Sequence, residues 1–380
     1  MATTGSMPKA NGRTEEWFAV LGRRDNPTDG VEDYCSFLGQ ALSAQGVRLQ
    51  NVRVLWPERG WLQALLDLWR ESRNWRSNWV LLQYTAMAWS RRGFPFGAVA
   101  VASILRRRGV RIAVIFHEPF RQGGQRWIDR CRGTCQDWVV QALYRRATKA
   151  IFADPVSTIG WIRGNEPKTA FVPIGPNLPT YSTESAAVAN RNGNTKTVVV
   201  FCLSDPPNRT RELEDIRHAM QFVQEHGVKS RVVFLGRGTV EAKGQIEQLF
   251  RSTAAEVSNL GLRDADELSR IFLQADAMLC VRGPLYPRRG SAIAGIACGL
   301  PVVGYAGAAE GTPLEEAGVQ LVPYGNREML GQALANVLTD EEIWKQLHEK
   351  SLRAYRSHFS WDIIAARMQR LLHQATGAET

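Results

Sequence analysis

The sequence has no apolar run close to the roughly 20 residues that a helix needs to cross a bilayer. Its first residues also lack the charged start, apolar stretch and small-residue cleavage site of a secretory signal peptide. Both absences predict a cytoplasmic protein. The positive net charge additionally suggests peripheral contact with the inner face of the membrane.

Cysteine is scarce, with six among 380 residues, and no two cysteines form a CxxC pair. Cys202, Cys280 and Cys298 lie in apolar stretches, where a free thiol acts as a small hydrophobic side chain. Cys131 and Cys135 are one helical turn apart and would supply half of a metal site, but no nearby His or Cys completes it. We therefore expect free thiols, no bound metal and no cofactor.

Acidic residues are scarce in the first half. The net charge of +10 arises between Trp17 and Pro176, whereas the two signs almost balance from Asn177 onwards. Arginines cluster at 91–92, 106–108 and 145–146. The tryptophans interleaved with these clusters are Trp56, Trp61, Trp69, Trp75, Trp79, Trp89 and Trp127.

Such a face suits nucleic acid, anionic lipid head groups or an anionic acceptor. The alternative is a solvated basic surface above core tryptophans. Because the chain shows no recognisable nucleic-acid-binding module, we expect no nucleic-acid partner.

The sequence does contain an alternation of strand-like and helix-like segments, and this alternation occurs twice. In the first half, strands are expected at 17–22, 52–56, 79–84, 112–116, 150–153 and 169–174, with a clear helix at 31–46. After a polar stretch, strands are expected at 197–204, 231–236, 277–281, 300–305 and 319–324, and helices at 212–227, 327–338, 341–355 and 360–375. The pattern predicts an α/β protein with two parallel sheets covered on both faces. Ligands should bind at the carboxyl ends of the strands, in a cleft between the halves.

Two junctions in the first half carry candidate residues. In DNPTDGVEDY (25–34), Gly30 permits a tight turn before a helix, whose free N–H groups suit an anion or a hydroxyl. The alternative is a plain strand-to-helix turn. In VIFHEPF (114–120), His117 and Glu118 follow the end of a strand, where a histidine can donate a hydrogen bond or stabilise developing charge. The alternative is a histidine that is hydrogen-bonded within a turn.

The second half carries three candidate segments. In SDPPNRT (204–210), Arg209 is placed to reach a diphosphate, because a planar cation pairs well with phosphate oxygens. In FLGRGT (234–239), Gly236 and Gly238 would admit a ligand close to the backbone. The third and most informative segment is RGPLYPRRGS (282–291), where Ser291 is a candidate N-cap.

At the end of this third segment, Arg288 and Arg289 precede a helix that starts at Gly290 and Ser291. Two cations beside a positive helix end predict a diphosphate site. The alternative is an exposed loop with two solvated arginines.

Taken together, these segments resemble the retaining GT-B glycosyltransferases of glycosyltransferase family four. Six stretches agree with that family in order and spacing over nearly the whole chain, and IACGLPVVGY is the most specific of them. The six are DGVEDYCSFLGQALSAQG (29–46), FHEPF (116–120), FVPIGPNLP (171–179), NLGLRDADELSRIFLQADAMLCV (259–281), IACGLPVVGY (296–305) and FSWDIIAARM (359–368).

The resemblance implies GT-B architecture, with two facing Rossmann-like domains and an interdomain cleft. Five parts are expected along the chain. They are a disordered tail (1–15), an acceptor domain (16–178), a linker (179–196), a nucleotide-sugar donor domain (197–357) and a C-terminal helix (358–380) that crosses back to the first domain.

The resemblance also implies transfer of a sugar from a nucleoside-diphosphate sugar, with retained configuration and without a metal. The acceptor would be a glycan, a lipid-linked saccharide or another surface-polymer precursor. We assign catalysis to His117 and Arg209. The donor-binding residues are Gly30, Gly236, Arg288, Arg289, Gly290, Ser291 and Glu310, and the acceptor-binding residues are Glu118, Arg91 and Arg92.

The chain departs from the family pattern at the donor site. The family carries two glutamates eight positions apart before ACGLPVV, and Tyr286 and Ala294 occupy those positions here. The usual Arg and Lys after the first strand of the second domain are also missing, and Arg209 is the one cation near the Lys position. Glu310 or Glu315 would then take over a hydroxyl contact.

Three readings follow from these departures. Either the donor site is rebuilt around YPRRGS (286–291), or the chain is a catalytically inactive GT-B scaffold or partner subunit of another glycosyltransferase. A nucleotide-sugar epimerase of the same architecture is a third possibility.

Overall fold

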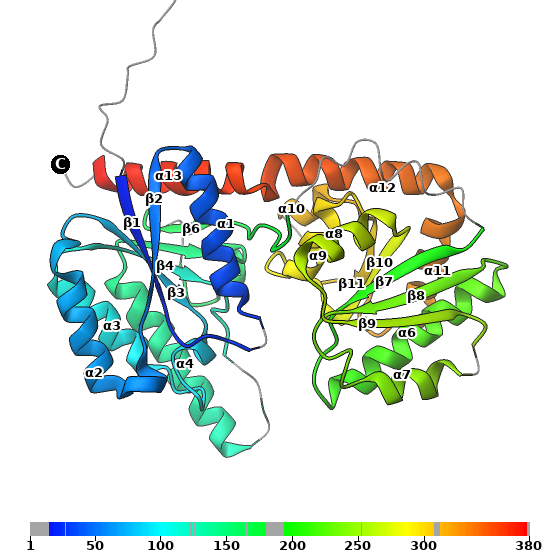
Figure 1. Ribbon diagram of the computed structural model, residues 1–380, viewed down its shortest axis with the longest axis horizontal. Coiled ribbons are helices and arrows are strands. Elements are labelled where there is room, and N and C mark those ends of the chain that lie inside the picture. Colours follow the sequence, from blue (N-terminus) through cyan, green and yellow to red (C-terminus); the bar gives the residue numbers. More distant parts are fainter. Residues whose placement is uncertain are drawn as a thin grey trace, which may run out of the picture. The chain divides into compact units, whose positions relative to one another are not determined.

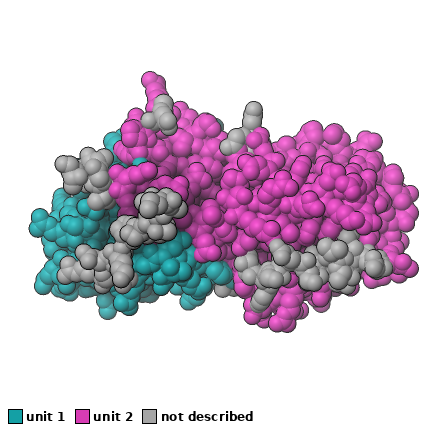
Figure 2. All heavy atoms as spheres, turned by 90° about the horizontal axis from the view of Figure 1, so that it is seen from above, with its two compact units in different colours: residues 1–115, 120–149, 375–380 teal, residues 116–119, 150–374 magenta. Residues whose placement is uncertain are grey.

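The computed structural model describes residues 15–26, 28–121, 124, 126–163, 166–179, 194–251, 253–307 and 312–377. Residues 1–14 of the expected tail, most of the expected linker and Glu310 lie outside these residues, whereas Glu15, expected in the disordered tail, begins the first strand. The chain divides into two compact units, which Figure 2 shows in different colours. One unit comprises residues 1–115, 120–149 and 375–380, and the other comprises 116–119 and 150–374.

The first sheet has six strands in the order β2-β1-β3-β4-β5-β6 (Figure 1). These strands are β1 (Glu15–Leu21), β2 (Val47–Arg53), β3 (Trp79–Tyr84), β4 (Arg111–Phe116), β5 (Lys149–Phe152) and β6 (Thr169–Phe171). The α-helices of the same half are α1 (Gly30–Ala44), α2 (Trp56–Glu71), α3 (Phe96–Arg107) and α4 (Trp127–Arg146). The order β2-β1-β3-β4-β5 is that of flavodoxin-like sheets, with its switch point between β1 and β3.

Most elements of this half lie where the sequence places them, but the second strand does not. It was expected at 52–56 and lies at Val47–Arg53, because Trp56 and Pro57 already begin α2. Proline is favoured at a helix start, where its missing N–H costs no hydrogen bond.

The tryptophans divide between core and surface. Trp56, Trp75, Trp79 and Trp89 are buried, as the core alternative predicts, whereas Trp69 and Trp127 are exposed.

The second sheet also has six strands, in the order β12-β11-β10-β7-β8-β9. These strands are β7 (Lys196–Phe201), β8 (Ser230–Leu235), β9 (Glu256–Gly261), β10 (Ala277–Pro284), β11 (Val302–Tyr305) and β12 (Val319–Val322). The α-helices are α6 (Asn208–Glu225), α7 (Lys243–Phe250), α8 (Ala265–Gln274), α9 (Gly290–Ala297), α10 (Pro313–Glu316), α11 (Arg327–Thr339), α12 (Glu341–Ala354) and α13 (Trp361–Gly377). Counted from β7, this is the Rossmann order 3-2-1-4-5-6, which reverses direction between β7 and β10.

Apolar clusters cover both faces of the second sheet, as a fully buried parallel sheet requires. Val198 and Val200 of β7 face the cluster that α6 and α11 complete. Val199, which points the other way, faces the cluster that α8 and α9 complete. The prediction of two helix-covered parallel sheets is confirmed, whereas β9 was not predicted as a strand.

The described residues include no helix with both the length and the apolar character that a membrane crossing demands. They also include no group of three or more His, Cys, Asp or Glu side chains arranged to hold a metal ion. All six cysteines are free thiols; Cys131 is exposed and Cys135 is half-buried.

Candidate functional site

The loops after β7 and β8 pack closely against each other at the carboxyl ends of these strands. Cys202 follows β7 with a φ of 68°, a left-handed conformation that is uncommon outside glycine. Gly236 follows β8 with a φ of 85°, and a Cβ there would lie 2.7 Å from Cys202 Sγ. A Cβ at Gly238 would lie 2.5 Å from the carbonyl oxygen of Leu203. Internal packing therefore accounts for both glycines, and the donor role of Gly236 stays a prediction.

Two arginines meet where the strand order reverses. Arg282 lies in the last residues of β10, and Arg289 is the N-cap of α9. The Arg289 guanidinium donates a hydrogen bond from Nη2 to the backbone carbonyl of Arg282, at 3.0 Å. Within the described part of the chain, the buried Nε of Arg282 has no hydrogen-bond partner. We call Arg282 and Arg289 the arginine pair.

The arginine pair carries like charges in a partly dry environment. Burial lowers the pKa of the Arg289 guanidinium, and the charge of Arg282 lowers it further. At Cys202, burial raises the thiol pKa, while Arg282, Arg237 and Arg289 oppose that rise. Like charges held together away from water are costly unless an opposite charge joins them. The arrangement therefore suits an anionic ligand at the carboxyl ends of β7 and β10.

Glu212 is the carboxylate that could neutralise the arginine pair, but it already has other partners. It lies buried in α6 and accepts a hydrogen bond from the backbone N–H of Ser204, at 2.8 Å. Its other oxygen lies 3.7 Å from Arg211. Glu212 raises the pKa of Arg289, but less than burial and Arg282 lower it. Glu212 therefore offsets less at Arg289 than the charge of Arg282 adds.

Arg209 lies in the first turn of α6 with 7% of its surface exposed. Its Nε donates to the carbonyl of Ser204 at 3.0 Å, and its Nη2 lies 3.6 Å from Asp205. These contacts tie the guanidinium to the loop after β7. The catalytic role assigned to Arg209 stays a prediction. In the structure, Arg209 stabilises the loop after β7 through its contacts with Ser204 and Asp205.

The helix start at Gly290 is confirmed, but Ser291 is not its N-cap. Arg289 occupies the cap position, and no side chain caps the helix. Ser291 follows as the second helical residue, because the turn before α9 closes one hydrogen bond earlier, from Arg289 N to the Tyr286 carbonyl. An uncapped helix start leaves N–H groups directed toward any anion bound there.

Arg288 points to a different partner from Arg289. Its Nη1 lies 2.7 Å from Oδ2 of Asp154, and its guanidinium stacks 4.5 Å above the ring of Tyr286. Asp154, just after β5, is 1% exposed, and its Oδ1 has no hydrogen-bond partner among the described residues. Burial raises the Asp154 pKa, while Arg288 opposes the rise. Arg288 and Arg289, which are adjacent in sequence, therefore have different partners: Arg288 forms an ion pair with Asp154, and Arg289 binds the backbone of Arg282.

His117 and Glu118 lie directly after β4, as the sequence predicts. His117 is half-buried and Glu118 is exposed. The Phe116 carbonyl accepts a hydrogen bond from Ala153 N at 3.2 Å, so His117 and Asp154 both follow a point where β4 and β5 are joined. This edge of the first sheet therefore carries a histidine and a buried carboxylate.

The predicted glycine loop is closed by an aspartate. Asp29 caps α1 by accepting hydrogen bonds from the N–H groups of Val31 and Glu32, so these groups are not free for a ligand. Arg53 holds Asp29 at 3.2 Å. Gly30 is the first residue of the helix, and the donor role assigned to it stays a prediction.

Of the remaining predicted residues, Arg91 and Arg92 are exposed. Arg91 donates to the Pro57 carbonyl at 3.4 Å, and the Arg92 carbonyl accepts from Arg132 at 2.9 Å. Glu310 lies outside the described residues, and Glu315 is exposed on α10.

Sequence reasoning missed Arg282, Glu212 and Asp154. Arg282 carried a usable signal, because it is a charge at the end of an apolar strand beside Gly283. Asp154 carried a similar one, since it follows a short apolar strand. Glu212 carried none, because it is one of several charges in a helix.

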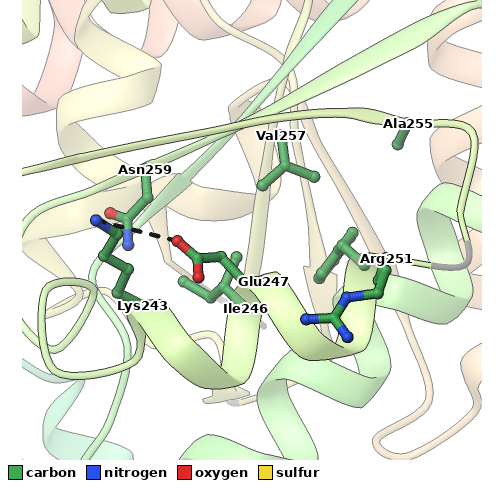
Figure 3. Close-up of a pocket in the computed structure, with 8 residues that line it drawn as sticks. Lys243, Ile246, Glu247, Arg251, Ala255, Val257 and Asn259 are labelled. Carbon is green, nitrogen blue, oxygen red and sulfur yellow. Dashed lines mark ion pairs between the residues drawn. The ribbon is translucent and has the colours of Figure 1, made fainter.

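A separate shallow pocket of about 320 Å³ lies between α7 and β9 (Figure 3). Lys243 and Glu247 on its wall pair with each other at 4.0 Å. Its lining includes no member of the arginine pair, and α7 and β9 lie away from the switch point between β7 and β10, so the arginine pair is the stronger candidate.

Comparison with known proteins gives structural neighbours alone. No protein-family model matches the chain, and a search of curated proteins gives no match either. Sucrose-phosphate synthase from Thermosynechococcus elongatus has a TM-score of 0.69 at 18% identity, over 96% of this chain and 100% of that one. HepE from Anabaena, solved with UDP and glucose, has a TM-score of 0.66 at 13% identity, over 95% and 100%.

A third neighbour is described as a UDP-N-acetylglucosamine 2-epimerase from Listeria monocytogenes. It has a TM-score of 0.62 at 10% identity, over 97% of this chain and 98% of that one. At these identities the likeness concerns the fold. The chain has the two-domain, Rossmann-like GT-B fold found in glycosyltransferases.

Proposed function

We propose that the protein is a glycosyltransferase that moves a sugar from a nucleoside-diphosphate sugar to an acceptor, with retention of configuration. The observation that carries the proposal is the arginine pair, held at the switch point of a Rossmann-type sheet. Ligands of open α/β sheets bind at such switch points. The fold shared with HepE, whose solved structure contains UDP and glucose, supports a nucleotide donor.

In the proposed reaction, the bond between the anomeric carbon and the β-phosphate oxygen breaks, and negative charge moves onto the departing diphosphate. Arg282 and Arg289 would stabilise that charge, together with the uncapped N-terminus of α9. Fixed donors aimed at developing charge lower the barrier, because no reorganisation is needed when the bond breaks. We assign the work that a metal does in other transferases to these cations.

His117 would contact the transferred sugar, where a hydrogen bond stabilises the transition state more than the ground state. We assign acceptor binding to Glu118, Arg91 and Arg92. The acceptor class that the sequence favours is a glycan, a lipid-linked saccharide or another surface-polymer precursor.

One observation favours a second candidate, an inactive GT-B scaffold or partner subunit. The family's glutamate positions hold Tyr286, stacked under Arg288, and Ala294, buried in the apolar cluster around α9. Neither residue can accept hydrogen bonds from sugar or ribose hydroxyls as a carboxylate does.

A thermal-shift screen across nucleoside diphosphates and their sugars tests the proposal, because a ligand of the native state raises Tm. A transferase should respond to at least one diphosphate and transfer the corresponding sugar only when an acceptor is added. A scaffold should respond to none. An epimerase should convert the donor with no acceptor present.

A further inference from the structure

Helix α2 exposes an apolar face. Beyond the non-helical Gly60, Leu62, Leu66 and Trp69 recur at i, i+4 and i+7, so they lie on one side of the helix. Their exposed fractions are 77%, 42% and 39%. Ala64 and Leu68 bury the opposite side. We call Leu62, Leu66 and Trp69 the α2 stripe; all three side chains remain exposed to solvent.

A depression of about 610 Å³ with a basic lining lies on α3, which packs against α2, and on α4. It is lined by Ser103, Arg106, Arg107, Arg145 and Arg146, which we call the arginine basin. The lining contains no acidic residue. Arg146 donates from Nε to Ser103 Oγ at 3.1 Å, which holds one guanidinium in place between the C-terminal ends of α3 and α4.

Arg108 joins the stripe to the basin. It follows Arg107 directly, and its guanidinium lies 3.5 Å above the ring of Trp69. It also donates a hydrogen bond to the Trp69 carbonyl. Arg108 therefore links the apolar α2 stripe to the arginine-rich end of α3, and α3 packs against both α2 and α4. Figure 1 shows α2 and α3 next to each other.

We propose that this surface docks on a bilayer that contains anionic lipid. Leucines and a tryptophan on one helix face, bordered by arginines, match the interfacial helices that lie in the headgroup region. The charge complements an anionic leaflet and not a neutral one. Asp67, the acid nearest to the stripe along the helix, is already paired with Arg59 at 2.5 Å. The proposal does not depend on the nucleotide chemistry proposed above.

Vesicle flotation tests the proposal with the full chain. The vesicles are phosphatidylcholine alone, or phosphatidylcholine with about 30% phosphatidylglycerol, at low and high salt. The protein should float with the anionic vesicles, and high salt should weaken binding through screening of the arginines. The variant R106Q/R107Q should bind about 25-fold more weakly, since each arginine near an anionic surface contributes about fivefold.

The apolar stripe is tested with L62Q/L66Q, which should bind about tenfold more weakly at either salt concentration. Matched controls lie elsewhere in the chain: R251Q/R370Q removes the same charge, and V240Q/M329Q removes exposed apolar side chains. Both controls should bind within twofold of the unchanged protein.

Three results would overturn the proposal: no flotation of the unchanged protein, equal losses in the controls, or unchanged binding of L62Q/L66Q. Self-association in lipid-free solution that L62Q/L66Q abolishes, without lipid binding, would assign the stripe to a second copy of the chain instead.

Discussion

The Arg289 side chain donates a hydrogen bond to the backbone carbonyl of Arg282 at the switch point of the second sheet, and the positive charge of Arg282 lowers the pKa of the Arg289 guanidinium. The contact satisfies one N–H group and leaves the repulsion between the charges in place. Such a pair works against folding stability, and sites kept for binding often do so. The predictions below follow from this relationship and from the residues around it.

Removing one charge of the pair should not destabilise the protein without ligand. Arg282→Met keeps much of the side-chain volume and removes both the like-charge repulsion and the buried, unpartnered Nε. We expect the free energy of unfolding to stay level or rise by about 1 kcal/mol. Urea unfolding measures it, with Arg251→Met as the surface control. A loss of more than about 2 kcal/mol would show that Arg282 is a structural residue.

Arg288 should matter for stability through Asp154. In Arg288→Ala, a nearly fully buried carboxylate loses its ion-pair partner, which should cost roughly 3 kcal/mol at pH 7. The folded-state pKa of Asp154 is already raised by burial and would rise further. The deficit is therefore fully present above that pKa and shrinks as the pH falls, because the folded state takes up the proton first.

Unfolding of Arg288→Ala at pH 7 and near pH 4.5 measures this effect. The double variant R288A/D154N provides the control, since a neutral amide needs no cation, and its stability deficit should be smaller and nearly independent of pH. A deficit in Arg288→Ala that stays constant with pH would rule out Asp154 as its cause.

Gly236 should tolerate no side chain. In Gly236→Ala, the new Cβ would meet Cys202 Sγ and the Phe201 ring within 3 Å, in a left-handed conformation. We expect a loss of roughly 2–3 kcal/mol. Gly244→Ala in α7 is the matched control. Its Cβ meets nothing within 4 Å, so helix propensity should make it neutral or stabilising by about 0.5–1 kcal/mol. Thermal unfolding separates the two, and equal Tm values would refute the packing argument.

The sequence predicted the positions of buried strands better than it predicted exposed strands or unusual backbone conformations. Strand and helix periodicity placed β3 at residues 79–84 without error, because a buried parallel strand is a continuous apolar run. It missed β9, whose residues are largely polar and half-exposed. Backbone conformation was harder to predict, because no residue type around Cys202 indicates that Cys202 adopts a left-handed conformation.

At the site, the cations were predicted better than their partners. Arg288 and Arg289 look equivalent in sequence, yet the first binds Asp154 and the second lies beside Arg282. Asp154 is distant from Arg288 along the chain, and Arg282 lies on β10 whereas Arg289 caps α9. Only the fold brings each arginine to its partner. Gly30 drew attention as a glycine, although Asp29 is the residue that caps the helix.

His117 should affect turnover and not donor binding. His117→Ala removes a side chain at the end of β4, on a different sheet from the arginine pair. We expect an unchanged Kd for the nucleoside diphosphate and a kcat that falls by a factor of 10²–10⁴, typical for the loss of a residue that assists catalysis. Steady-state kinetics and calorimetry on one preparation measure both quantities. A Kd that rises with no change in kcat would move His117 to the donor site.

The most direct test of the arginine pair is calorimetric titration of UDP into the unchanged protein, Arg289→Ala and Arg282→Met. The account predicts binding by the unchanged protein, and a loss of about 10- to 100-fold or more in each variant while both remain folded, because a charge-assisted hydrogen bond contributes about 1.5–3 kcal/mol. Equal UDP affinity in all three folded proteins would contradict it.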